Sequence, residues 1–185
     1  MKIFDHDRAG VASALTTFAP IIPGEEETVR ELIEALPQGE ESPFARLPQL
    51  HCSRLHILRE LQYQGGGQKP DELASSYLVF TSSYDGELDD YLDTICDEIP
   101  EEADSWWSHC VAYPGTADRA AFKRYIRSHH RKTSLFAAAY PPETVQSVRD
   151  ALELRRRVVD FVVDTQGLSA AELQRRFDET FAEAV

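Results

Sequence analysis

A unit that recurs three times along this chain constrains its fold more than any other feature of the sequence. Each copy has a short apolar segment with a Phe, then a turn, then a Glu seven positions after the Phe that opens an amphipathic stretch. The copies run from Phe18 to Glu25, from Phe80 to Glu87 and from Phe136 to Glu143. Such strand–turn–helix units predict a sheet with helices packed on it, because each amphipathic helix must bury its apolar face.

The remaining segments complete the order of predicted elements. Apolar composition predicts strands at residues 12–22, 49–62, 77–81 and 106–113, and periodic apolar spacing predicts helices at 25–36 and 88–99. The first 113 residues therefore have the order β-α-β-β-α-β, the ferredoxin-like arrangement of an α+β protein. We expect helices on one face of the sheet, and on the other face a second sheet, a ligand cavity or both.

Beyond this core we predict a helix–strand–helix addition, with helices at 120–128 and 144–164 and a strand at 134–139. Ser169 and Glu172 form the capping box of a short tail helix. The expected organisation is a loose N-terminal arm at residues 1–11, a single α+β domain at 12–168 and a short C-terminal helix at 169–185. Residues 65–70, with three successive glycines, are expected to be the least ordered interior segment.

The charge of the chain argues against two classes of partner. Nineteen Lys and Arg against thirty-two Asp and Glu give a net charge of −13, which repels nucleic-acid phosphates and anionic lipid. We therefore expect no nucleic acid and no membrane as partners. Three cysteines without paired spacing argue against a disulfide framework or a structural zinc site. With no apolar run of signal-peptide or membrane-span length, the cytoplasm is the expected compartment.

Two predicted strands carry most of the residues that could perform chemistry. In residues 51–56, alternation puts Arg54 and His56 on one face and His51 on the other. One face of the second strand, residues 106–113, carries three such side chains: Trp107, His109 and Tyr113. A His can act as an axial ligand, a general base or a hydrogen-bond donor, and an Arg supplies a fixed cation. The same residues can also serve only as a core histidine and an ion-pairing arginine.

Two further features have both a chemical and a structural interpretation. Asp85 precedes Gly86 at a turn that leads into a helix, where an Asp can belong to a site or can cap the helix. Residues 123–132 form a basic cluster in this acidic chain. The cluster could receive an acidic partner or an anionic substrate, or could pair with the acidic helices.

Several short motifs give a resemblance to a known group of proteins. They are Leu-Thr-Thr-Phe-Ala-Pro-Ile, Ser-Pro-Phe-Ala-Arg, His51-x-x-Arg54, Tyr84-Asp85-Gly86 and His109-Cys110-x-x-Tyr113-Pro114-Gly115. Over roughly residues 12–168 the chain resembles a family of poorly characterised bacterial proteins, similar in layout to the dimeric α+β-barrel superfamily. Some members occur beside or fused to peroxidase-type enzymes. The resemblance implies a ferredoxin-like homodimer.

More distantly, the layout resembles that of dye-decolourising peroxidases and chlorite dismutases, which bind haem through a His and place an Arg on the distal side. This resemblance implies haem as a cofactor, with His109 as the axial ligand of the iron and Arg54 as the distal cation. Asp85 would be a third catalytic residue, although Ser82 replaces the first Gly of the peroxidases' Gly-x-x-Asp-Gly motif. We predict that the rest of the cofactor site consists of His51, His56, Trp107 and Tyr113.

Three functions follow as hypotheses. The first is a small oxidoreductase, peroxidase-like if haem binds, with a pocket on the open sheet face. The second is a non-catalytic accessory or binding protein for a partner enzyme such as a peroxidase or a lipoxygenase, favoured by the lack of a strong catalytic motif. The third is a cofactor-free monooxygenase that uses Trp106, Trp107 and Tyr113 as a substrate slot. A homodimer and a small-molecule ligand are expected.

Overall fold

The computed structural model describes residues 6–62, 65–67 and 73–182. The chain divides into two compact units, Met1–Val145 and Gln146–Val185. The sequence predicts a single domain from residue 12 to residue 168 that includes the long helix at 144–164. In the structure nearly all of that helix belongs to the second unit. Residues 1–5 of the predicted arm and residues 68–70 of the glycine-rich segment lie outside the described part of the chain.

The first unit is built on an antiparallel sheet. Its strands are β1 (Arg8–Ala9), β2 (Ala12–Pro20), β3 (Leu50–Leu58) and β4 (Tyr77–Asp85), in the order β1-β2-β4-β3. Since β2 and β3 both pair antiparallel with β4, they run parallel to each other with β4 between them. The helix α1 (Glu26–Glu34) and two short 3-10 helices at Gly39–Glu41 and Pro43–Arg46 connect them. The predicted α+β class is confirmed, and part of the predicted arm pairs with the sheet as β1.

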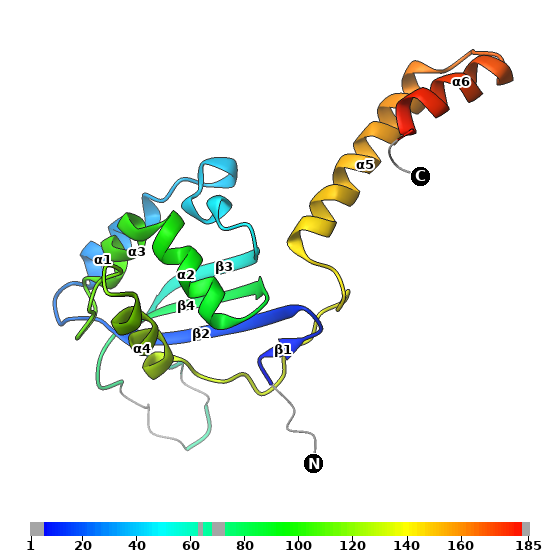
Figure 1. Cartoon of the computed structure of the whole chain (residues 1–185). Helices are drawn as coiled ribbons and strands as arrows, with labels where there is room; N and C mark the ends of the chain where they lie inside the picture. The colour runs from blue at the N-terminus through cyan, green and yellow to red at the C-terminus, as the bar shows by residue number, and fades with distance from the viewer. Residues whose placement is uncertain (1–5, 63–64, 68–72, 183–185) are drawn as a thin grey trace. The chain divides into compact units, whose positions relative to one another are not determined.

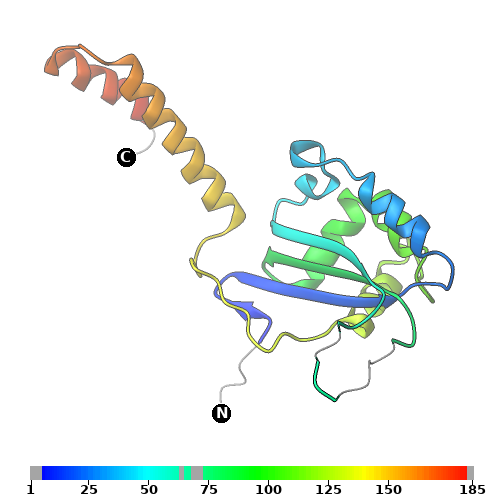
Figure 2. The same ribbon diagram turned by 180° about the vertical axis from the view of Figure 1, so that it is seen from behind.

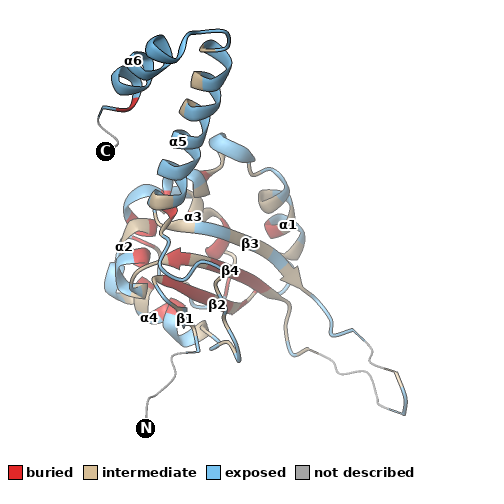
Figure 3. Cartoon of the chain, turned by 90° about the vertical axis from the view of Figure 1, so that its right-hand side faces the viewer, coloured by how far each residue is buried: buried red, intermediate tan, exposed pale blue. Residues whose placement is uncertain are grey.

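Helices cover one face of this sheet. They are α1, α2 (Leu88–Glu98), α3 (Pro100–Trp107) and α4 (Arg119–His129). From the front, α2, α3 and α4 lie over the strands, and from behind the strands lie before the helices (Figures 1 and 2). The sheet contributes Leu15, Leu78 and Phe80 to a core that also holds apolar side chains of every one of these helices. Accordingly β2 and β4 are largely buried, whereas β3 is partly exposed (Figure 3).

The prediction of a strand at 106–113 is wrong. Trp106 and Trp107 end α3, which Pro100 opens at its first position, with two acidic residues in its first turn. Both indoles are about 1% exposed, so the apolar run belongs to a buried helix face and not to a strand. The residues that follow are irregular apart from one bridge between Cys110 and Ile21. The fourth strand of the ferredoxin-like order is therefore not formed there.

The strand predicted at 134–139 is also wrong. These residues have no regular secondary structure, and Leu135 is 82% exposed. The edge of β2 that faces away from β4 is already used by β1 and by a bridge from Thr17 to His130, and Ile21, just beyond β2, bridges to Cys110. A further strand would have no free neighbour at this edge, so the apolar segment of the third copy stays irregular, whereas the helix that follows it is formed from Val145 to Asp164.

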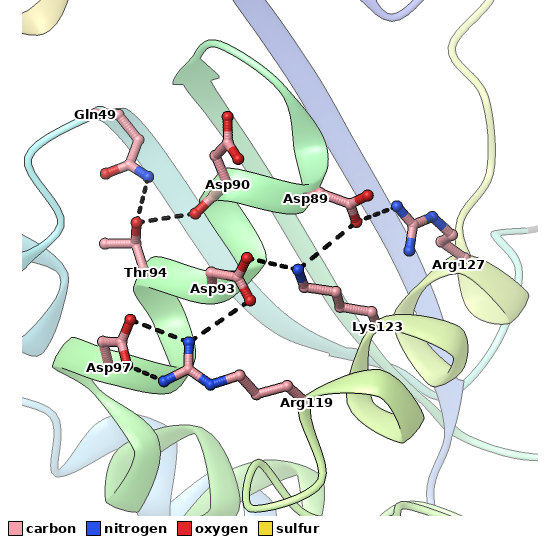
Figure 4. Close-up of polar contacts among 9 residues, drawn as sticks. All are labelled: Gln49, Asp89, Asp90, Asp93, Thr94, Asp97, Arg119, Lys123 and Arg127. Carbon is pink, nitrogen blue, oxygen red and sulfur yellow. Dashed lines mark hydrogen bonds and ion pairs between the residues drawn. The ribbon is translucent and has the colours of Figure 1, made fainter.

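Two rows of opposite charge join α2 to α4. Each row has a spacing of four residues, which puts its members on one side of a helix: Asp89, Asp93 and Asp97 on α2, and Arg119, Lys123 and Arg127 on α4. The Nζ atom of Lys123 lies 2.6 Å from Oδ2 of Asp93, with an ion pair on either side (Figure 4). This part of the basic cluster is thus paired within the chain.

The second unit is a helical hairpin. It comprises α5 (Val145–Asp164), apart from its first residue, and α6 (Ala170–Phe181). The predicted capping box of Ser169 and Glu172 is confirmed at the start of α6. The ring of Phe161 lies edge-on to those of Phe177 and Phe181, with centroids 5.9 and 5.4 Å away. This aromatic cluster holds the two helices together.

Candidate functional site

The structure places Arg54 and His109 at opposite edges of the sheet. Arg54 lies on β3, the outermost strand on one side, and is exposed. His109 follows α3 on the other side, where its carbonyl oxygen accepts the N–H of Ile22 at 2.9 Å, directly after β2. Since β4 and β2 lie between them, the two residues do not face a common cavity within one chain.

The other predicted pocket residues around His109 are engaged in the core. The Nδ1 atom of His109 lies 3.0 Å from Oε2 of Glu25, and about a quarter of the imidazole is exposed. Trp107 packs between Phe80 and Phe122, at centroid distances of 5.4 and 5.7 Å. These contacts make Trp107 a part of the core and not the wall of an open slot.

Tyr113 is held by an acidic neighbour. Its hydroxyl donates to Oδ1 of Asp104 at 2.7 Å, and Asp104 also accepts the backbone N–H and the hydroxyl of Thr116. Burial, and then the bond to Asp104, raise the pKa of Tyr113 well above its ordinary value. The phenol therefore stays protonated and fixes the loop after α3.

His51 and Asp85 meet at one end of the sheet. A register shift between Leu50 and Cys52 marks a bulge at His51, whose Nε2 lies 2.8 Å from Oδ1 of Asp85. The second oxygen of Asp85 accepts the N–H of Val145 at 2.7 Å, where α5 begins. The N-cap position of α2 is Glu87, so Asp85 does not cap α2 and instead binds the backbone at the last residue of the first unit.

His56 lines a hollow of about 300 Å³ beside α1. The hollow lies at the edge of the sheet, and its other charged residues pair with one another across its rim: Glu27, Arg30, Glu34 and Arg59. His56 and Arg54 share the exposed side of β3, as the alternation predicted. Neither is brought near His109.

A hollow of about 370 Å³ beside the N-terminal half of β2, here termed the basic hollow, combines a cavity with several cationic side chains. Ten residues line it, including four basic or imidazole side chains: Arg8, Arg127, His130 and Lys132. Arg8 pairs with Glu87, and Arg127 pairs with Asp89. The acidic residues of the lining are Asp7 and Glu87. Three cationic side chains in the lining thus stand against two carboxylates, and Asp89 offsets the third cation through Arg127, so the hollow is close to neutral in a chain whose net charge is −13.

A half-buried carboxylate, that of Asp7, fixes one wall of the basic hollow. Asp7 accepts hydrogen bonds from the backbone N–H of Thr133 at 2.7 Å, from its hydroxyl at 2.8 Å and from Nε2 of His130 at 3.1 Å. Burial alone would raise the pKa of Asp7, but these hydrogen bonds outweigh it and lower the pKa below its ordinary value. The sequence analysis missed this network because 123 positions separate Asp7 from His130, and no local pattern marks either residue.

Replacing Asp7 with Asn is expected to lower the free energy of unfolding at pH 7 by about 2 kcal/mol, because three hydrogen bonds lose a charged acceptor. Since the folded pKa of Asp7 is lowered, its contribution is complete above the ordinary pKa and is lost as the pH falls through the folded value. Urea titrations from pH 7 down to about pH 2 should show the two proteins converging. The exposed Asp90→Asn variant should change stability by less than about 0.5 kcal/mol at pH 7.

In the described ranges, no three His, Cys, Asp or Glu residues gather in a way that could hold a metal ion. None of the described helices combines the length and the apolar character that a bilayer crossing requires. Comparison with protein-family models, with curated proteins and with solved structures found no match.

Proposed function

We propose that the protein is a non-catalytic binding protein whose basic hollow takes an anionic group, carried by a small molecule or by an acidic segment of a partner enzyme. The single observation that carries this proposal is the concentration of Arg8, Arg127 and Lys132 around one hollow of a strongly acidic chain. Among the residues predicted to be catalytic, Arg54 and His109 do not converge, which favours binding over catalysis.

The hollow has the features that anion binding requires. The network of Asp7 and Thr133 holds His130 in place, so its wall is formed before a ligand arrives. Lys132 is exposed and adds a cation that can contact the ligand directly. Arg8 and Arg127 each already share their charge with a carboxylate, so an incoming anion gains most from Lys132.

The experiment is an isothermal titration of the full chain with inorganic phosphate and with a tetraglutamate peptide at low and high salt. Binding to one of the two probes is expected, weaker at high salt because exposed charges are screened. Lys132→Glu should weaken it about tenfold, since a reversed charge turns attraction into repulsion. Tetraglutamate binding alone would identify an acidic segment as the ligand, and phosphate binding alone a small anion.

The matched control is Arg131→Glu, which makes the same change in net charge one position away. Arg131 is exposed and does not line the hollow. Its substitution should alter binding by less than about twofold at physiological salt. Equal losses in the two variants, or no binding of either probe by the wild type, would disprove the proposal.

The rival is the haem-dependent oxidoreductase. The Glu25 carboxylate on Nδ1 of His109 favours it, because such a pair orients an imidazole ligand and raises its basicity. The separation of Arg54 from His109 counts against it, since the implied distal and axial residues do not meet in one chain. Protein purified from haem-supplemented cells should show no Soret band if the protein only binds anions. A band that disappears in His109→Ala would favour the oxidoreductase.

A further inference from the structure

An apolar stripe runs along α5 on the side away from α6. Its members are 43–59% exposed although they are aliphatic: Val148, Leu152, Val159, Val162 and Val163. Phe161, which packs against Phe177 and Phe181 of α6, lies on the opposite side of α5, so α6 does not cover the stripe. The spacing matches a heptad in which residues 152 and 159 occupy a positions and residues 148 and 162 occupy d positions. Arg155 occupies the d position between them.

A row of alternating charge borders this stripe. Its members, at spacings of four, three and four residues, share one side of the helix next to the stripe: Arg149, Glu153, Arg156 and Asp160. Read from the N-terminus the signs are plus, minus, plus, minus. Read from the C-terminus they are reversed, so the row is complementary to an antiparallel copy of itself.

We propose that the α5 stripe is the interface with a second copy of this chain, paired antiparallel along α5. When Val148 lies level with Val159 of the second copy, Leu152 lies level with the aliphatic stem of Arg155 of that copy. In this register Arg149 faces Asp160 of the second copy and Glu153 faces Arg156 of the second copy, offset by about 3 Å along the axis. The two-fold axis repeats both pairs.

The same row distinguishes the antiparallel pair from the parallel one. In a parallel in-register pair the two-fold axis runs along the helices, so the rows of the two copies lie on opposite flanks of the pair and their charges do not meet. In the antiparallel pair the two rows lie on the same flank, and opposite charges face each other. Charge complementarity therefore favours a second copy as the occupant of the stripe, in the antiparallel direction.

The experiment is sedimentation equilibrium of the full chain across a concentration series. The wild type is expected to show the mass of two chains. The double variant Arg149→Glu/Glu153→Arg keeps the net charge and the charge alternation within each half of the row, but it sets like charges against each other across the pair. It should raise the dimer dissociation constant at least tenfold, and less at 1 M salt.

The matched control reverses the whole row: Arg149→Glu, Glu153→Arg, Arg156→Glu and Asp160→Arg. This variant is again self-complementary and should dimerise as the wild type does, yet it should not exchange subunits with the wild type. Leu152→Ser should weaken both dimers, and circular dichroism should show unchanged helicity throughout. A monomeric wild type, or equal dimerisation of the half-reversed and fully reversed rows, would overturn the proposal.

Discussion

Replacing Trp107 with Ala is expected to lower the free energy of unfolding by about 3–5 kcal/mol. The indole is about 1% exposed and contacts the rings of Phe80, Trp106 and Phe122 from the sheet, from α3 and from α4. Its removal leaves a cavity where these elements meet, and the surrounding rings cannot collapse fully to fill it. Equilibrium unfolding in urea, followed by far-ultraviolet circular dichroism, measures the change.

Two variants with smaller expected effects serve as comparisons for Trp107→Ala. Trp107→Phe keeps a ring in the cluster and should cost about 1–2 kcal/mol, because the indole N–H has no hydrogen-bond partner within the described structure. Leu135→Ala alters a side chain that is 82% exposed and should cost less than about 0.5 kcal/mol. If Trp107→Ala left stability nearly unchanged and instead abolished binding of a small aromatic molecule, Trp107 would belong to a substrate slot, as the monooxygenase hypothesis requires.

Gly10→Ala is expected to detach the segment around Pro141 from the sheet and to lower stability by about 2–3 kcal/mol. Gly10 has φ +68°, and a Cβ atom there would lie 1.9 Å from the carbonyl oxygen of Pro141. That oxygen accepts the N–H of Val11 at 2.9 Å, so the clash falls on the contact that holds the segment. Hydrogen exchange at Val11, together with urea unfolding, reports the local and the global effect.

Gly86→Ala separates the conformational penalty of a positive φ from the clash with Pro141. Gly86 also has a positive φ, +87°, but an added Cβ atom would meet nothing within 4 Å. This variant should therefore cost only the conformational penalty of about 1 kcal/mol. Equal losses at Gly10 and Gly86 would mean that the contact with Pro141 contributes nothing.

Much of the fold could be predicted from local patterns. The apolar strands β2 and β4, the helices α1, α2, α4 and α5, and the capped start of α6 all carry their signal within about ten residues. The two wrong strands show the limit of this reasoning. A short, largely apolar run such as Trp106–Cys110 fits a buried helix as well as a strand. Pro100, six residues before Trp106, was the better signal, because Pro is favoured at the first position of a helix.

Of the candidate site, the sequence could predict the charged residues but not their contacts. The spacing of Asp89 and Asp93, and of Lys123 and Arg127, is visible in the sequence, but which helices face each other is set by the tertiary packing. The network of Asp7, His130 and Thr133 depends on a short strand that places residue 7 beside residue 130. No period or motif encodes such a contact, so the basic hollow became apparent only from the three-dimensional arrangement.

The outer side of β3 has a consequence for the behaviour of the protein in concentrated solution. No described strand pairs with that side, and such open margins are sites where sheets of different molecules can join into fibrils. Here the margin is interrupted by the bulge at His51, and β3 carries exposed Arg54 and His56 with Arg59 just beyond it. The irregular backbone and the polar side chains oppose pairing of this edge with a strand of another molecule. The unpaired edge of β3 is therefore protected against fibril formation.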